Sequence, residues 1–232
     1  MKASVLDVAR YSFCPKFYEQ KGTIPVADSE CQGDFDSLLT YVFRRDFETG
    51  AKVTWKSLLD KWTKIFWERH LAQTEEYKAK YNRSLIALKQ FHSWYLELPL
   101  SIVAINFSLS ASFYNHQLQG EIPVILDNGD GTVTLIISEQ FQKTGLVKWT
   151  PVVRYLPVVM DQAAPVSKIV VLSFMDYRIF NTCTIEPSGR FWQTAMLDLL
   201  NILQSMQDGV SYSNTLACSF CPLASTCEAL SE

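Results

Sequence analysis

The spacing of apolar residues along the chain changes near Pro99, from a helical period before that residue to a strand period after it. Apolar residues recur every three or four positions over residues 35–47, 54–71 and 75–98, which predicts three amphipathic helices. A shorter helical pattern covers residues 3–21. The Cys-Pro pair inside it is expected to break the helix, because proline disfavours helical backbone at the preceding residue.

Alternating apolar and polar residues in the middle of the chain predict a β-sheet. Residues 102–118, 120–126 and 132–138 are expected to form a three-stranded meander. The sequence Asp-Asn-Gly-Asp-Gly between the last two strands is typical of a tight hairpin. Residues 169–174 and 178–185 predict a second pair of strands.

The remaining patterns complete an α/β chain. The apolar run over residues 151–166 is interrupted by prolines but allows a short helix, and residues 191–206 carry the stripe of an amphipathic helix. No internal repeat is present, so we expect one α/β domain over residues 1–232, with helices flanking a central mixed sheet. Its expected parts are a helical region over about 35–98, a sheet core over 99–190, and a C-terminal helix with a tail over 191–232.

Composition and charge narrow the classes of function. The 232 residues are 48% hydrophobic and 13% aromatic, which indicates a globular chain with a substantial core. No secretory leader and no membrane-spanning apolar window is recognisable, so we expect a cytoplasmic protein of a reducing compartment. The net charge of −3 argues against strong attraction of the whole molecule to phosphates, so any nucleic-acid contact should be local. Five basic residues are candidates for such a contact: Arg44, Arg45, Lys143, Lys148 and Arg154.

Four cysteines have the features of a metal site. Cys218, Cys221 and Cys227 form a C-x2-C-x5-C array beside Pro222, which supplies three of the four thiolates that a metal centre needs. The best donor of the fourth ligand is Cys14, because it is also followed by proline and is flanked by aromatic residues that can exclude water. We therefore predict one centre that joins the two ends of the chain.

The identity of the metal is open between two chemistries. Four thiolates suit tetrahedral zinc or an iron-sulfur cluster. The wide separation of the ligands and the two Cys-Pro pairs favour a four-iron four-sulfur cluster, with zinc as the alternative and free thiols or a redox pair as the reading without a metal. Cys31, in a polar and turn-like stretch, and Cys183, in a strand-like run, are expected to be ordinary residues.

The order of elements and the cysteine motifs together resemble the iron-sulfur branch of the PD-(D/E)XK nuclease superfamily, which includes RecB-type and AddB-type exonuclease domains and CRISPR adaptation nucleases. Three segments carry the resemblance: residues 11–18 (Tyr-Ser-Phe-Cys-Pro-Lys-Phe-Tyr), residues 218–227, and the hairpin over residues 120–137. The resemblance implies a sheet of restriction-endonuclease type, a four-iron four-sulfur cluster that staples the two ends of the chain, and DNA as the substrate class.

The chain departs from that family at the residues that perform catalysis. In the family, the third residue after the hairpin glycine is a metal-binding aspartate, and the next strand ends in an acid, any residue and a lysine. Pro123 stands at the first position, and Ser138 and Gln140 stand at the acid and the lysine. The family's helical histidine is absent from residues 36–40, and residues 105–106 (Ile-Asn) occupy the neighbourhood of a further expected acid.

These departures predict the loss of catalysis. Magnesium-dependent hydrolysis of a phosphodiester needs carboxylates to hold the ion, and a lysine or a metal to activate water and offset charge. Proline cannot coordinate through its side chain, and serine and glutamine are weak neutral ligands. We therefore predict a catalytically inactive nuclease fold without catalytic residues. It would act as a structural, protein-interaction or DNA-holding module of a replication, recombination or adaptation complex in a bacterial or phage-infected cell.

Two alternatives stay open. The chain could be an active metal-dependent DNA exonuclease with a displaced site, in which Glu139 and Lys143 share one side. Asp127 and Asp130 are better explained by the hairpin turn, and Glu121 is expected on the sheet face opposite to that of the preceding glycine. The second alternative, of a different class, is a zinc-stabilised adaptor with no nucleic-acid role.

Overall fold

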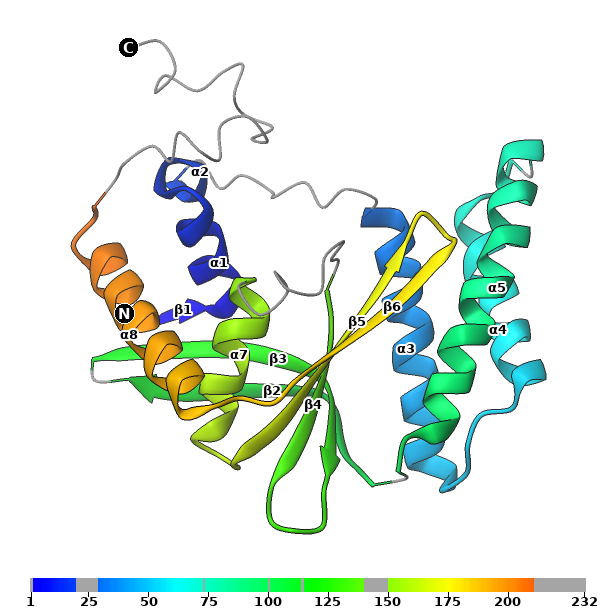
Figure 1. Ribbon diagram of the computed structural model, residues 1–232. Coiled ribbons are helices and arrows are strands. Elements are labelled where there is room, and N and C mark those ends of the chain that lie inside the picture. The colour runs from blue at the N-terminus through cyan, green and yellow to red at the C-terminus, as the bar shows by residue number, and fades with distance from the viewer. Residues whose placement is uncertain are drawn as a thin grey trace.

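The computed structural model describes residues 2–19, 29–72, 74–99, 101–113, 115–139 and 150–210. In that part of the chain a six-stranded mixed sheet lies between two layers of helices (Figure 1). The sheet consists of β1 (Lys2–Ser4), β2 (Ile102–Phe113), β3 (His116–Asp127), β4 (Val133–Ser138), β5 (Val166–Met175) and β6 (Ile179–Ile185).

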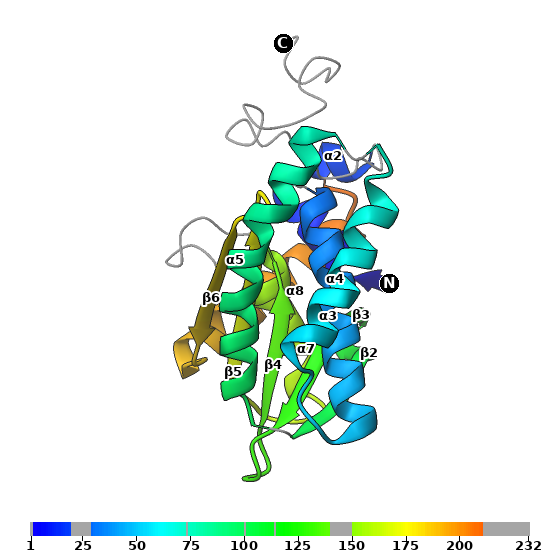
Figure 2. The same cartoon turned by 90° about the vertical axis from the view of Figure 1, so that its right-hand side faces the viewer.

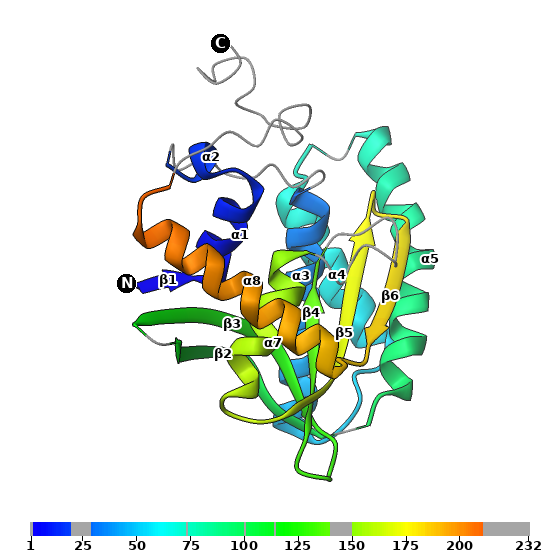
Figure 3. The ribbon, with the colours of Figure 1, turned by 60° about the vertical axis from the view of Figure 1, so that its left-hand side comes forward.

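The helices divide between the two faces of the sheet. One layer consists of α1 (Val5–Phe13), α7 (Pro151–Asp161) and α8 (Gly189–Gln207), which share a hydrophobic core with one sheet face (Figure 3). The other layer consists of α3 (Ser29–Thr49), α4 (Trp55–Arg69) and α5 (Glu75–Glu97), which share a second core with the opposite face (Figure 2). The short α2 (Pro15–Glu19) follows α1. The class is therefore α/β, as predicted.

The strand order is β1-β3-β4-β5-β6, with β2 paired to β3. The β1–β3 and β4–β5 pairs are parallel, the latter joined through α7, and the other pairs are antiparallel. Strand β1 pairs with residues 117–119 of β3, and β4 begins its pairing only at Val124. Along the edge of β3 that pairs with β1 and then with β4, residues 120–123 therefore pair with neither strand. We call this opening between β1 and β4 the fork.

At the fork, the regular alternation of β3 side chains between the two faces of the sheet is interrupted. Ile122 belongs to the core under α7, whereas Val124, two residues later, belongs to the core under α3. Two residues of a regular strand that are two positions apart face the same side, so the alternation is broken at Pro123. In β2 the register passes from Ile105–Val124 to Phe107–Ile122, and Asn106 between them has a left-handed φ of 49°. Pro123 lacks an N–H group and cannot donate a ladder hydrogen bond at this irregularity.

Most predicted elements are confirmed, with corrections at three places. Helix α1 ends at Cys14 before Pro15, as expected, but β1 precedes it where only helix was predicted. The long strand predicted over residues 102–118 is two strands, since β2 ends at Phe113 and β3 begins at His116. Helix α3 begins at Ser29, so Cys31 is a fully buried helical residue, not a turn residue. The prediction was wrong there because two nearby polar residues, Gln32 and Asp34, are themselves buried.

Candidate functional site at the fork and the strand ends

The first turns of α3 pack against the ends of β4 and β5. The side-chain amide of Gln32 donates hydrogen bonds to Asp36 Oδ1 at 3.0 Å and to the hydroxyl of Ser138. Its carbonyl oxygen accepts from the backbone N–H of Phe174 at 3.5 Å. Gln32 is 8% exposed, so this amide is a buried link between α3 and two strands. The link brings the α3 segment, where the resemblance placed a histidine, next to Ser138.

Two carboxyl groups share this corner. Burial and, to a smaller extent, the charge of Asp36 together raise the pKa of Glu139 to about 7. Burial also raises the pKa of Asp36, against hydrogen bonds from Ser138 and Gln32 that lower it. Part of Asp36 is exposed to solvent, so its shift carries less weight than that of the half-buried Glu139. The corner therefore favours protonation of one carboxyl group near neutral pH.

The hairpin itself carries none of the family's acids at the expected positions. Pro123 lies at the irregularity of β3, and the Ser138 hydroxyl is engaged by Gln32. Gln140 and Lys143 lie outside the described residues. Asp127 and Asp130 are turn residues as predicted: their Oδ1 atoms accept from Gly129 N at 2.8 Å and Thr132 N at 2.9 Å.

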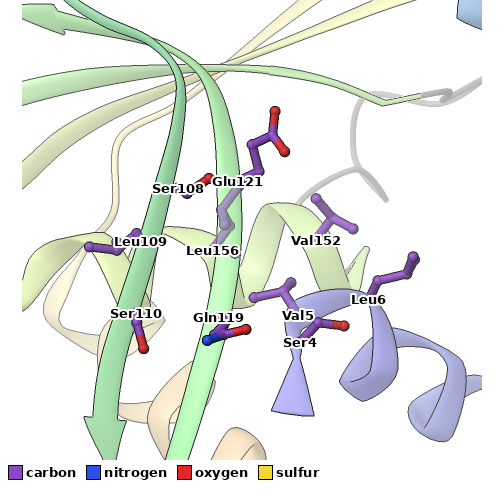
Figure 4. A pocket seen from close by; sticks show the side chains of 11 residues that line it. Ser4, Val5, Leu6, Ser108, Leu109, Ser110, Gln119, Glu121, Val152 and Leu156 are labelled. Carbon is purple, nitrogen blue, oxygen red and sulfur yellow. The ribbon is translucent and has the colours of Figure 1, made fainter. Parts of the chain in front are cut away.

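A mainly apolar pocket of about 570 Å³ opens beside the fork (Figure 4). Gly120 faces α7, because a Cβ at this residue would lie 2.5 Å from Leu156 Cδ1. Glu121 is exposed and pairs across the strands with Ser108. Its carboxylate points away from Ser4 and Val5 in Figure 4, so it lies on the face opposite to that of Gly120, as expected. The lining contains a single carboxylate and no cation, which falls short of a two-acid, one-lysine nuclease site.

A buried polar network that the sequence reasoning missed lies on the other side of α3. Asp34 is fully buried, and its carboxylate accepts from Tyr177 Oη at 2.9 Å and lies 2.5 Å from Arg69 Nε. His70 Nε2 is 3.1 Å from Tyr177 Oη. Burial raises the pKa of Asp34 to about 6, against lowering by Tyr177 and Arg69, and burial lowers the pKa of His70. Tyr177 N also donates to Cys31 Sγ at 3.2 Å, so the network anchors the β5–β6 turn to α3.

Cys14 occupies a position that fits a ligand of a centre joining the two chain ends. It follows the last residue of α1, is 7% exposed, and its N–H donates to Arg10 O at 3.1 Å. The Tyr11 hydroxyl donates to the carbonyl of Val210, so the chain begins its last segment beside α1. Seven residues lie between Val210 and Cys218, and the eight Cα-to-Cα steps can span at most about 29 Å. Cys218, Cys221 and Cys227 lie outside the described residues, and within the described ranges no three His, Cys, Asp or Glu side chains form a metal-binding group.

The three described candidates for phosphate contact lie in two places, on α3 and on α7. Arg154 forms an ion pair with Asp198 that ties α7 to α8, and only 12% of its side chain is exposed. Arg44 and Arg45 are exposed on α3. Lys143 and Lys148 lie outside the described residues. Arg154 is therefore better explained by packing between helices than by nucleic-acid contact.

Comparison with known proteins gives a likeness of fold. No protein-family model and no curated protein matches the chain. The crystal structure of the protein named "Putative exonuclease" from Eubacterium rectale matches 96% of this chain and 86% of its own, with a TM-score of 0.55 and 10% identity. The crystal structure of SSO0001 matches 98% and 86%, with a TM-score of 0.45 and 11% identity. The first likeness supports a nuclease-like α/β fold. Among the described helices, none has the length and apolar character needed to cross a membrane.

Proposed function

We propose that this chain is a catalytically inactive nuclease-fold protein that holds DNA or protein partners in a DNA-processing complex. The observation that carries the proposal is the hairpin at the fork. Pro123, where the alternation of β3 is broken, carries no carboxylate, and the hydroxyl of Ser138 is bonded to the buried Gln32 amide. The described part of the hairpin is a folded scaffold that lacks, at the family's positions, the metal-binding carboxylates that phosphodiester hydrolysis requires.

The first test is a cleavage assay on single-stranded and double-stranded DNA with Mg²⁺ or Mn²⁺. We expect no degradation above a metal-free control in either metal. Metal-dependent degradation by the purified chain would overturn the inactive assignment. Binding of the same DNA without cleavage would support the holding role.

The proposed resident cofactor is a four-iron four-sulfur cluster held by Cys14, Cys218, Cys221 and Cys227. The cluster would supply a covalent link between α1 and the C-terminal tail, so its binding free energy would be folding free energy. The burial of Cys14 and the contact between Tyr11 and Val210 support this assignment. A zinc ion on the same four thiolates is the alternative.

Iron, sulfide and zinc analysis of anaerobically purified protein tests the cofactor. We expect iron and sulfide together with a broad visible absorption band, and their loss in Cys14→Ser. Cys183→Ser is the matched control, since Cys183 is a half-buried residue of β6. Stoichiometric zinc would favour the zinc-stabilised adaptor. A metal-free wild type would contradict both the iron-sulfur cluster and the zinc alternative.

A displaced active site is the second candidate, and the corner formed by Asp36 and Glu139 favours it. A divalent cation between two carboxyl groups with raised pKa values would relieve their repulsion. If the chain degrades DNA, this candidate expects the activity to fall sharply in Asp36→Asn and Glu139→Gln. It should persist in Asp130→Asn, whose carboxylate belongs to the hairpin turn.

A further inference from the structure

The acidic net charge of the chain conceals a basic segment that contains the helices α4 and α5. Residues 51–100 contain nine of the 21 lysines and arginines but only five of the 24 acidic residues, a net charge of +4 against −7 for the rest. This segment includes α4 and α5, which lie on the α3 side of the sheet, with α5 next to β6 (Figures 1 and 2). A positive potential on one side of a molecule attracts polyanions even when the whole molecule is acidic.

Helix α5 meets the β5–β6 turn around a polar pocket of about 340 Å³. Lys80 and Arg83 of α5 and Arg178 of the turn line it, and we call these three residues with the space between them the basic pocket. Glu30 and Asp176 also line the pocket, so its charged lining has one positive charge in excess. It is concave and polar, which suits a compact anion.

Two cations of the basic pocket, Arg83 and Arg178, are exposed and can contact an anion, whereas Lys80 forms an ion pair with Glu76 at 2.9 Å. Arg178 lies 3.5 Å from Asp176 in an ion pair with both side chains more than half exposed, and such pairs contribute little stability. Arg83 is exposed to solvent on α5. Arginine binds a phosphate group through two parallel hydrogen bonds, which is stronger than an exposed pair with a carboxylate.

The position of the basic pocket is fixed by the buried network. Asp176 and Tyr177 have left-handed φ values of 51° and 55° and are the central residues of the turn that Arg178 N closes by donating to Met175 O at 3.0 Å. The Tyr177 hydroxyl is bonded to the buried Asp34, so the turn carrying Arg178 is held against α3. A site on a fixed turn loses little conformational entropy when it binds a ligand.

The basic pocket and the fork lie at the same end of the sheet. Glu30, which lines the pocket, and Gln32, which contacts Ser138 beside the fork, are two residues apart on α3. The contacts of Gln32 with Ser138 and Phe174 connect the ends of β4 and β5, and the basic pocket follows at the end of β5. An extended polymer crossing the ends of these strands would therefore pass both places.

We propose that the basic pocket binds the phosphate backbone of the nucleic acid held by this chain. The inference rests on the proposed DNA-holding function and adds the surface that performs it. Nucleic acid fits better than an acidic protein, because the pocket is small and concave and two of its three cations are arginines, which match phosphate geometry. Arg44, Arg45 and Arg154, the described members of the five basic residues considered from the sequence, do not line this pocket.

Fluorescence anisotropy with labelled single-stranded and duplex DNA over a series of salt concentrations tests the proposal on the full chain. The test variant is Arg83→Glu with Arg178→Glu. The matched control is Lys168→Glu with Arg190→Glu, which makes the same change of charge at exposed residues of β5 and α8. Lys168 lies near the start of β5, the end opposite to the turn. Circular dichroism and thermal unfolding confirm that both variants fold, and the milder pair Arg83→Gln with Arg178→Gln replaces a test variant that does not.

The wild type is expected to bind DNA with an affinity that falls as salt rises. The test variant should lose roughly tenfold or more in affinity and about two units of salt slope, because two phosphate contacts are removed. The control should bind within about twofold of the wild type, since its charges lie elsewhere.

Four outcomes would overturn the inference. Equal loss in both variants would mean that only net charge matters, and no loss in the test variant would place the contact elsewhere while leaving the DNA-holding function intact. Displacement of DNA by poly-glutamate at an equal concentration of charge would assign the surface to an acidic protein. A wild type that binds no DNA would end both this inference and the DNA-holding role, whereas the inactive assignment is decided separately by the cleavage assay.

Discussion

At the scale of single residues, the ionisation of Glu139 makes the stability of the fold depend on pH. Its folded pKa of about 7 is above its ordinary value of 4.5, so its favourable contribution is complete below about pH 4.5 and is lost as pH rises through 7. Glu139→Gln keeps the shape and cannot ionise. We expect the variant to match the wild type in melting temperature at pH 5 and to exceed it at pH 8.

Glu121→Gln is the control for that measurement, since it makes the same chemical change at an exposed position of β3. Its melting temperature should follow the wild type at both pH values. An equal shift at pH 5 and pH 8 in Glu139→Gln would show that the effect is one of packing and not of ionisation.

Arg69 gives a second prediction with the same sign of pH dependence. It lowers the pKa of the buried Asp34, whose net value is about 6 because burial raises it by more than Tyr177 and Arg69 lower it. Arg69→Gln should raise that pKa further, so more stability is lost above pH 6 and little below it. Because Arg69 is partly exposed, we expect a cost of about 1–2 kcal/mol at pH 8 and a smaller cost at pH 5, measured by urea denaturation.

The double variant Asp34→Asn with Arg69→Gln separates charge from shape. Once Asp34 cannot ionise, the added cost of Arg69→Gln at pH 8 should fall toward its value at pH 5. A cost that stays the same in both backgrounds would mean that Arg69 acts through its packing.

At the scale of elements, the contact between β3 and α7 depends on one glycine. A Cβ at Gly120 would lie 2.5 Å from Leu156 Cδ1 and 3.3 Å from Val5 Cγ2, and both side chains are buried. Gly120→Ala should cost about 1–3 kcal/mol of unfolding free energy, because the helix or its leucine must shift. Chemical denaturation of the single variants, Gly120→Ala and Leu156→Ala, and the double variant gives the coupling. If the two costs simply add, the steric explanation is wrong.

The elements could be predicted where burial follows a simple period. Helices α4, α5 and α8 and the later strands have regular apolar spacing, so their approximate positions follow from the sequence. The start of α3 could not be predicted, because Gln32 and Asp34 are polar residues that are buried. Asp34 finds its partner Tyr177 143 positions away, and nothing local in the sequence indicates that pairing.

The sequence was enough to predict which family residues the candidate site lacks, but not which residues the fold brings together there. Pro123 and Ser138 could be identified from the hairpin motif alone. The proximity of Asp36 to Glu139 depends on how α3 packs on the end of β4, which only the tertiary structure gives. The basic pocket likewise joins α5 to the distant Arg178.

At the scale of the whole molecule, the proposed cluster would hold one layer of helices more than the other. Cys14 lies after α1 and Val210 follows α8, both in the layer with α7, whereas α4 and α5 pack in the second core. Removal of the metal by a chelator under reducing conditions should therefore raise amide hydrogen exchange first in α1, α2 and the end of α8. Mass spectrometry of peptides would measure it, with α4 and α5 as the internal reference. Equal deprotection of both layers would contradict the prediction.

The two cores have a consequence for how the strands find their alignment. In β4, Leu135 and Ile137 enter one core and Ile136 enters the other, and β5 is apolar on both faces in the same way. A slip by one residue would therefore still bury apolar side chains on both sides, so hydrophobicity alone discriminates poorly between alignments. The discrimination falls to polar contacts at the strand ends: the Gln32–Ser138 bond, the aspartate turn after β3, and the Tyr177 anchor after β5. These few hydrogen bonds therefore select the correct alignment of the strands.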